Sequence, residues 1–200
     1  MVPILASACS VIGIRTAEEA PYEVLEKQGA FEIRRYPELV VVETVVGDER
    51  SRGGSEETAF FRLFDYIRGA NAGQQKIDMT APVLIEAEGR SIARTVPVVS
   101  EETEEGMRMS FVLPADLDLG SAPAPEDSRL TVRRLEGARI ASLRYSGSRS
   151  EEAFERRVSE LRRWLTERGI EPSSQPRYAG YDPPFTIPFF RRHEVWIELL

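Results

Sequence analysis

The side chains that ordinarily carry enzyme chemistry are scarce in this sequence of 200 residues. It has one histidine, His193, and one cysteine, Cys9. A single cysteine excludes an internal disulfide and a cysteine-based zinc site, and a single histidine excludes a site built from several imidazoles. A Ser-His-Asp triad would have to use His193 itself as its base. These counts remove much of ordinary enzyme chemistry.

Two carboxylates that follow His193 in the sequence are candidates for a catalytic base. Glu194 or Glu198 would serve as the base of a hydrolase if it faced a cavity. The sequence shows no nucleophile–base pair and no cluster of metal ligands to accompany them. We therefore predict a protein that binds a ligand without turning it over, with an uncharacterised hydrolase as an alternative.

Composition and charge narrow the range of partners. The formal net charge is −7, whereas a binder of DNA or RNA needs a net basic face. The arginines of segment 151–168 alternate with glutamates, which is typical of a solvated helix face. The hydrophobic fraction of 42% suits a globular chain. We expect one domain, a monomer, and no nucleic-acid partner.

Residues 1–20 have features of a leader segment. Residues 1–14 carry no charged side chain and are too short to span a bilayer, which takes roughly 20 apolar residues. Small residues before Cys9 resemble a bacterial lipoprotein cleavage site, although Leu5 is one position too far away and no positive segment precedes it. We expect 1–20 to be a leader and tether, with lipidated Cys9 as a membrane anchor. The protein would then be periplasmic or membrane-anchored; the alternative is a cytoplasmic protein with an apolar N-terminal segment.

An internal repeat organises the rest of the chain. Residues 32–47 and 131–147 each read as a strand ending in Arg-Arg, a short turn, and a second strand ending in glycine. Each is followed by a helix that opens with Ser-Glu-Glu, at Ser55 and at Ser150. A serine oxygen can accept a hydrogen bond from the free N–H groups there, and the glutamates suit the positive end of the helix dipole.

Hydrophobic periodicity predicts helices at 56–70 and 151–168, the first with Phe60, Leu63, Phe64 and Ile67 on its buried face. Alternation and β-branching predict strands at 22–27, 31–36, 38–46, 77–86, 92–99, 107–113, 129–136, 138–145, 177–181 and 193–199. The predicted fold is α+β, a single domain over 21–200. It is a distorted antiparallel β-barrel of two pseudo-twofold related halves (22–114 and 129–200) with two packing helices. The groove where such halves meet is a common small-molecule site.

Three segments resemble a known family. They are Lys76–Val83 (KIDMTAPV), Met109–Pro114 (MSFVLP) and the stretch from Tyr178 to Trp196. In this order they resemble the SOUL family of haem-binding proteins, over nearly the whole chain from Tyr22. The resemblance implies a barrel with two helices that is similar to bacterial effector-binding domains. It also implies binding of haem or another tetrapyrrole against segments 56–70 and 182–190.

The first helix offers a face for such a ligand. Phe61 lies about 100° away from the buried stripe, where it could stack on a flat apolar ring. Arg68 or Arg62 would meet a propionate, and Phe64 and Asp65 complete the predicted surface. The alternative is that Phe61 packs under a loop from the other half.

The loop before the last strand would supply the other side of the predicted ligand site. Phe185, Ile187, Phe189 and Phe190 stand among prolines, which stiffen the loop and lower the entropic cost of holding a surface. The alternative is that these side chains seal the end of the barrel.

His193 is the one conventional nitrogen ligand for a haem iron. The histidine that ligates iron in some SOUL proteins lies elsewhere, so His193 does not inherit that role; it is equally a polar residue at the start of a strand. The alternative iron ligands are Tyr66, Tyr178, Met79 or water. Without an iron ligand, any planar anionic tetrapyrrole would bind. A further alternative is a broad-specificity module that holds effectors or amphiphiles in its barrel cavity.

Overall fold

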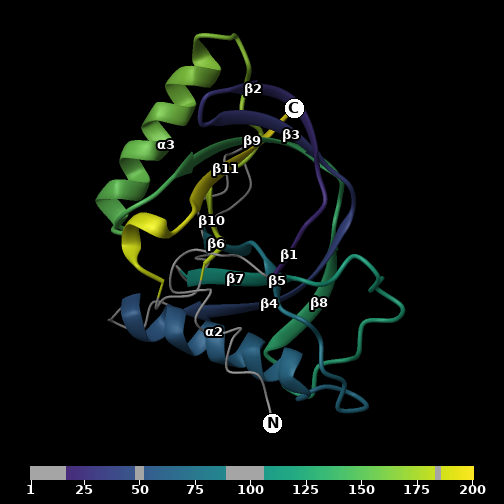
Figure 1. Cartoon of the computed structure of the whole chain (residues 1–200). Coiled ribbons are helices and arrows are strands. Elements are labelled where there is room, and N and C mark those ends of the chain that lie inside the picture. The colour runs from purple at the N-terminus through teal and green to yellow at the C-terminus, as the bar shows by residue number, and fades with distance from the viewer. Residues whose placement is uncertain (1–16, 48–51, 89–105, 183–185) are drawn as a thin grey trace, which may run out of the picture.

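A computed structural model describes residues 17–47, 52–88, 106–182 and 186–200 (Figure 1). Phe185, the predicted strand 92–99 and Cys9 lie outside these residues. The strands of the main sheet are β2 (Glu23–Gln28), β3 (Phe31–Tyr36), β4 (Leu39–Gly47), β6 (Val83–Glu88), β7 (Gly106–Val112), β8 (Leu130–Leu135), β9 (Ala138–Tyr145), β10 (Arg177–Gly180) and β11 (His193–Leu199).

These strands form an antiparallel sheet of order β2-β3-β9-β11-β10-β6-β7-β4-β8, which curls into a half-barrel. Two short strands, β1 (Glu18–Glu19) and β5 (Thr80–Ala81), pair in parallel beside it. The helices α2 (Arg52–Arg68) and α3 (Glu151–Thr166) cover the outer surface of the sheet, and a single 3₁₀ turn, η1 (Pro188–Phe190), precedes β11. The predicted α+β class, with a curled antiparallel sheet and two packing helices, is confirmed.

The pairing of strands crosses between the two halves. The strands of each predicted strand–turn–strand unit do not pair with each other. Instead β3 pairs with β9, with Ile33 opposite Ala141, and β4 pairs with β8, with Val42 opposite Val132. The first strand of each predicted unit thus pairs with the second strand of the other unit, and one sheet results.

Helix α3 follows the sequence prediction closely. Ser150 has extended backbone angles and its hydroxyl accepts a hydrogen bond from the Ala153 N–H at 3.3 Å. The helix buries Val158, Leu161 and Leu165 against β9 and β11 because these residues recur along one face. The capping role predicted for Ser150 is confirmed.

Helix α2 differs from the prediction at its start and on its buried face. It begins at Arg52, so Ser55 lies inside the first turns, where its hydroxyl donates to the Gly47 carbonyl at 3.4 Å instead of capping the helix. The prediction of a cap at Ser55 was wrong because the chain turns helical before the Ser-Glu-Glu motif. The fully buried side chains are Ala59, Leu63 and Tyr66. Phe60 and Phe64 are only half-buried, at the border of this face.

One predicted strand is broken in two. The segment predicted as 77–86 contains β5 and β6, which are separated by Pro82. Proline has no N–H to donate to a ladder, so pairing is interrupted there. The short strand β1, which pairs with β5, was not predicted because two residues give no periodicity.

The curled sheet has two different surfaces. Its inner surface holds a cluster around Val41, Tyr36 and Trp196, and its outer surface packs against α2 on one side and α3 on the other. Alternate residues of each strand serve these two surfaces, as the pleat requires. None of the helices in the described part of the chain is long and apolar enough to cross a membrane.

Candidate functional site

The solvent side of α2 carries a large exposed aromatic ring. Phe61 is 52% exposed, and Asp65 and Arg68 are exposed on the same helix. Helical periodicity places these three residues away from the buried stripe of Ala59, Leu63 and Tyr66. Phe61 therefore lies off the core stripe, as the sequence predicts, with about half of its surface exposed.

Phe61 is part of a run of rings that begins in the core. The Phe60 ring lies 5.4 Å from Phe111 of β7, 5.7 Å from Phe64 and 6.0 Å from Phe61, measured between centroids. The Phe60–Phe61 pair is edge-to-face, a favoured aromatic geometry. Phe61 thus stands on a packed aromatic base, which limits its motion and suits it for stacking on a flat ligand.

Two arginines of α2 take different directions. The Arg68 guanidinium lies 5.4 Å above the Phe64 ring and is exposed to solvent. Arg62 is half-buried, and its Nη1 donates to the Thr44 hydroxyl of β4 at 3.5 Å. Of the two arginines considered for a ligand carboxylate, Arg68 is the one on the solvent side.

The turn η1 presents a second exposed aromatic surface. Phe189 is 66% exposed and Phe190 is 43% exposed, and their ring centroids are 4.4 Å apart. Ile187 is half-buried at the start of the turn and accepts a hydrogen bond at its carbonyl from the Phe190 N–H at 2.9 Å. Most of the Phe189 surface and less than half of the Phe190 surface face solvent.

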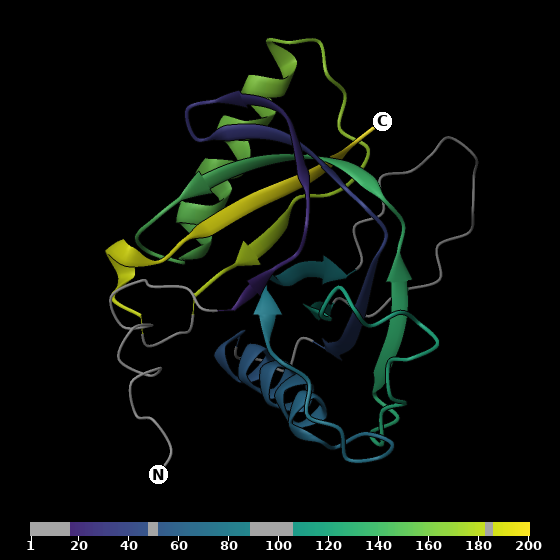
Figure 2. The same ribbon diagram turned by 45° about the vertical axis from the view of Figure 1, so that its right-hand side comes forward.

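The turn η1 is linked to the first turns of α2 through residues 147–149. Figures 1 and 2 both place the yellow η1 turn nearest the N-terminal end of α2. An ion pair between Arg149, in the turn before α3, and Glu56 of α2 ties this region together. Arg149 did not stand out in the sequence, and Glu56 was predicted only to suit the helix dipole, since nothing local marks a charge that pairs across so many residues.

His193 is buried, with 3% of its surface exposed, and both ring nitrogens have partners. Nδ1 lies 2.7 Å from the Tyr178 hydroxyl and Nε2 lies 3.3 Å from the Gly147 carbonyl oxygen. Burial lowers the pKa of the imidazole below its ordinary value of 6.5, which keeps the ring neutral. An iron atom at either nitrogen would have to displace one of these hydrogen bonds.

The other side chains considered as iron ligands differ in access. Tyr66 is fully buried and donates to the Pro123 carbonyl at 2.8 Å, and burial raises its pKa to about 12. Tyr178 bonds to His193, as described above. Met79 is 36% exposed. Within the described residues there is no group of three or more His, Cys, Asp or Glu side chains able to hold a metal ion.

Glu194, considered as a hydrolytic base, is the centre of an ion cluster on the inner surface of the sheet. Its carboxylate accepts hydrogen bonds from Arg34 at 2.7 and 3.0 Å, Arg192 at 2.9 Å, Tyr181 at 2.9 Å and Trp196 at 2.7 Å. Burial alone would raise the pKa of this carboxyl, but the two arginines outweigh it and the pKa is lowered. Because its oxygens already accept these hydrogen bonds and its pKa is lowered, Glu194 has the environment of a buried carboxylate with a structural role.

Glu198, the other carboxylate considered, is similarly engaged. It accepts from Arg177 at 2.6 Å, and Arg177 also donates to Glu86 of β6 at 2.9 Å. Both carboxylates thus connect strands through arginine: Glu198 links β11 to its neighbour β10, and Glu194 links β11 to β3 across β9.

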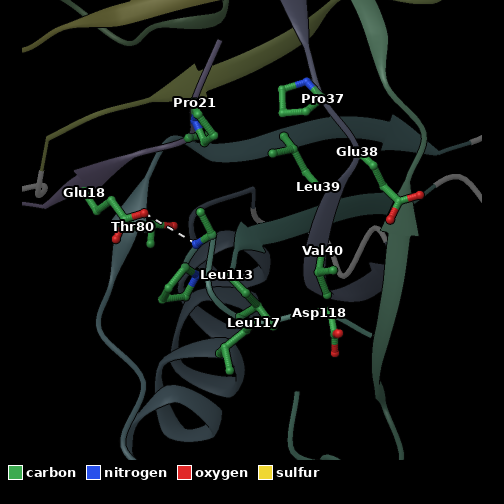
Figure 3. A pocket seen from close by; sticks show the side chains of 13 residues that line it. Glu18, Pro21, Pro37, Glu38, Leu39, Val40, Thr80, Leu113, Leu117 and Asp118 are labelled. Carbon is green, nitrogen blue, oxygen red and sulfur yellow. Dashed lines mark hydrogen bonds between the residues drawn. The ribbon is translucent and has the colours of Figure 1, made fainter. Parts of the chain in front are cut away.

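A pocket of about 320 Å³ is lined by residues from Glu18 to Asp118, all of which precede β8 in the chain (Figure 3). Its floor is formed by aliphatic side chains and prolines, among them Leu39 and Leu117. Carboxylates stand at its rim, with Glu38 and Asp118 on one side and Glu18 on the other. Among the described residues that line it there is no lysine or arginine. The pocket therefore has an apolar floor and an acidic rim.

Fold and site together define an α+β domain with a curled antiparallel sheet, two outer helices and exposed aromatic rings beside them. Solved structures share this architecture. The C-terminal domain of EcmrR superposes with a TM-score of 0.59 at 11% identity, covering 90% of this chain and 98% of that domain. A protein described as a hydrolase from Listeria innocua gives a TM-score of 0.58 at 13% identity, covering 88% of this chain and 94% of the other. At these identities the likeness concerns the fold alone.

The sequence comparison is more specific. The family described as "SOUL heme-binding protein" matches residues 17–198, and the chain belongs to this family. Heme-binding protein 2 of Mus musculus is 27% identical over 180 residues, which cover 90% of this chain and 82% of that protein. The resemblance read from the three sequence segments is therefore confirmed.

Proposed function

We propose that this protein binds haem or a related planar, anionic tetrapyrrole without catalysing a reaction, on the surface formed by α2 and η1. The observation that carries the proposal is the exposure of Phe61 at 52% on a packed aromatic base. Such a ring stacks on a flat apolar ligand, while Arg68 offers a cation for a ligand carboxylate. The family and the name of its mouse relative support haem or a tetrapyrrole as the ligand class.

The exposed residues fit the tetrapyrrole ring and its carboxylates better than they fit its iron. Phe61, Phe189 and Phe190 would contact the ring, and Arg68 would pair with a propionate. When bound, haem would supply redox-active iron, but His193 and Tyr66 both have their polar atoms in hydrogen bonds. Recognition would then rest on stacking and charge, so that iron adds little affinity.

Parallel titrations with hemin and with metal-free protoporphyrin IX test this proposal. We expect saturable 1:1 binding of both, with dissociation constants within about threefold of each other. Arg68→Ala should weaken both equally, whereas Arg162→Ala, an exposed arginine on α3, should not change them. Absence of saturable binding would refute the proposal. A preference for hemin of about a hundredfold or more would refute the part that concerns iron.

The pocket in Figure 3 supports a second candidate, an amphiphile-binding module. Its aliphatic floor suits a hydrocarbon chain, and the rim of Glu18, Glu38 and Asp118 suits a cationic head group. Alkyl ammonium and alkyl sulfonate probes of the same chain length distinguish this candidate. Preference for the ammonium probe, reduced by Glu18→Gln, would support it; equal or absent binding would exclude it.

A further inference from the structure

One short turn connects η1 with the two helices. In the turn 147–150, the Gly147 N–H donates to the Pro188 carbonyl of η1 at 3.1 Å. Arg149 pairs with Glu56 of α2. Ser150 caps α3 through its hydrogen bond from Ala153 N–H at 3.3 Å. The position of η1 relative to α2 therefore depends on this turn.

His193 contacts the turn 147–150 from the protein interior. A carbonyl oxygen can only accept, so Nε2 carries the proton and donates to the Gly147 carbonyl at 3.3 Å. In the neutral ring Nδ1 then accepts from the Tyr178 hydroxyl at 2.7 Å. The rings of Tyr145 and Tyr178 lie 5.2 and 5.6 Å from the imidazole, between centroids. With 3% of its surface exposed, His193 is fixed in orientation by contacts on several sides.

Gly147 is suited to this role by its backbone. Its φ is 107°, in the left-handed region that favours glycine, and a Cβ there would meet no atom within 4 Å. A side chain at this position would therefore act by changing the backbone conformation, not by a clash. The peptide groups on either side of Gly147 are the ones that bond to His193 and to η1.

We propose that His193 is the positioning residue of the tetrapyrrole site: through Gly147 it fixes the turn 147–150 and thereby holds the Phe189–Phe190 surface in place beside α2. The ligand part of this inference rests on the proposed function, whereas the positioning part does not. The sole histidine thus acts on the site through the backbone, without touching the ligand.

Hydrogen exchange of the ligand-free protein tests the positioning directly. His193→Ala should raise amide exchange in segments 146–150 and 186–192 by about tenfold, because the half-buried Gly147 carbonyl loses its donor. His193→Gln should restore protection to within about threefold, since a glutamine amide can donate from near the Nε2 position. A hemin titration of the same variants should show weaker binding for the alanine variant and recovery for the glutamine variant.

The outcomes separate the two proposals. Wild-type protein that fails to bind hemin, with exchange still raised in His193→Ala, would refute the tetrapyrrole function and support the positioning role. A folded His193→Ala variant with unchanged exchange in both segments would overturn the positioning role, as would failure of glutamine to restore protection. If the alanine variant does not fold, His193→Leu decides. It fills the space of the ring but cannot donate to the Gly147 carbonyl, and unchanged exchange in 146–150 would then overturn the inference.

Discussion

Replacing Phe61 by alanine should weaken tetrapyrrole binding while leaving the fold intact. A phenylalanine has roughly 200 Å² of surface, and 52% of the Phe61 surface is exposed, so about 100 Å² is available to a ligand. A flat ring on one face covers about half of that area. At about 25 cal/mol per Å², this contact contributes about 1.2 kcal/mol.

The expected effect on binding follows from this energy. One covered face corresponds to a rise in the dissociation constant of about eightfold, and complete coverage to about sixtyfold. Because the side chain lies at the surface, the free energy of unfolding should change by no more than about 0.5 kcal/mol.

The assay is a titration of Phe61→Ala with protoporphyrin IX, followed by ligand fluorescence, with urea unfolding measured on the same preparation. Leu119→Ala is the matched control, because Leu119 is 43% exposed and lies in the segment between β7 and β8, outside the proposed site. Phe189→Ala should weaken binding at least as much as Phe61→Ala, since Phe189 is 66% exposed. A dissociation constant within about twofold of wild type for Phe61→Ala would show that α2 does not form the binding surface.

Three further predictions concern stability. Glu194→Gln should lower the free energy of unfolding in urea by about 3–5 kcal/mol, because it leaves Arg34 and Arg192 uncompensated. The control Glu198→Gln, at a partly exposed ion pair, should lower it by less than about 1 kcal/mol. Equal losses for the two variants would contradict this argument. The pKa of Glu194 is lowered from 4.5, so its stabilisation should be complete above that pH and lost as the pH falls through the lower folded-state value. Urea midpoints between about pH 7 and pH 3 should therefore fall more steeply for wild type than for Glu194→Gln, and parallel curves would speak against this assignment. Ser150→Ala should lower the free energy of unfolding by about 1 kcal/mol, because α3 loses its N-cap. Ser55→Ala should lower it by about half as much or less, since Ser55 makes one long hydrogen bond and does not cap α2. The reverse order of the two variants in thermal unfolding would contradict the capping geometry.

The exposed part of the site could be predicted from local patterns. The position of Phe61 follows from helical periodicity, because the residues of the buried face recur at fixed intervals along α2. The exposure of Phe189 and Phe190 was one of two alternatives that the sequence left open. Aromatic residues among prolines suit both a binding loop and a plug, and only the packing of η1 decides between them.

The roles of charged and titratable residues could not be predicted in this way. Glu194 was considered as a base, but Arg34, which is 160 residues away in the chain, is one of the residues that engage its carboxylate. His193 was considered as a metal ligand, and its ring nitrogens bond to Tyr178 and to the Gly147 carbonyl. Such partners depend on which strands are neighbours, and no local pattern contains that information.

The sequence by itself determined the elements of this protein: the alternating strands, the capped helix α3 and the family, through motifs spread along the chain. Tertiary structure alone decided that β3 pairs with β9 and β4 with β8, so that each half completes the other. It also decided that one turn connects α2, α3 and η1. The physical reason is that periodicity is a property of neighbouring residues, whereas pairing and burial of charge are set by segments that meet only when the sheet has curled.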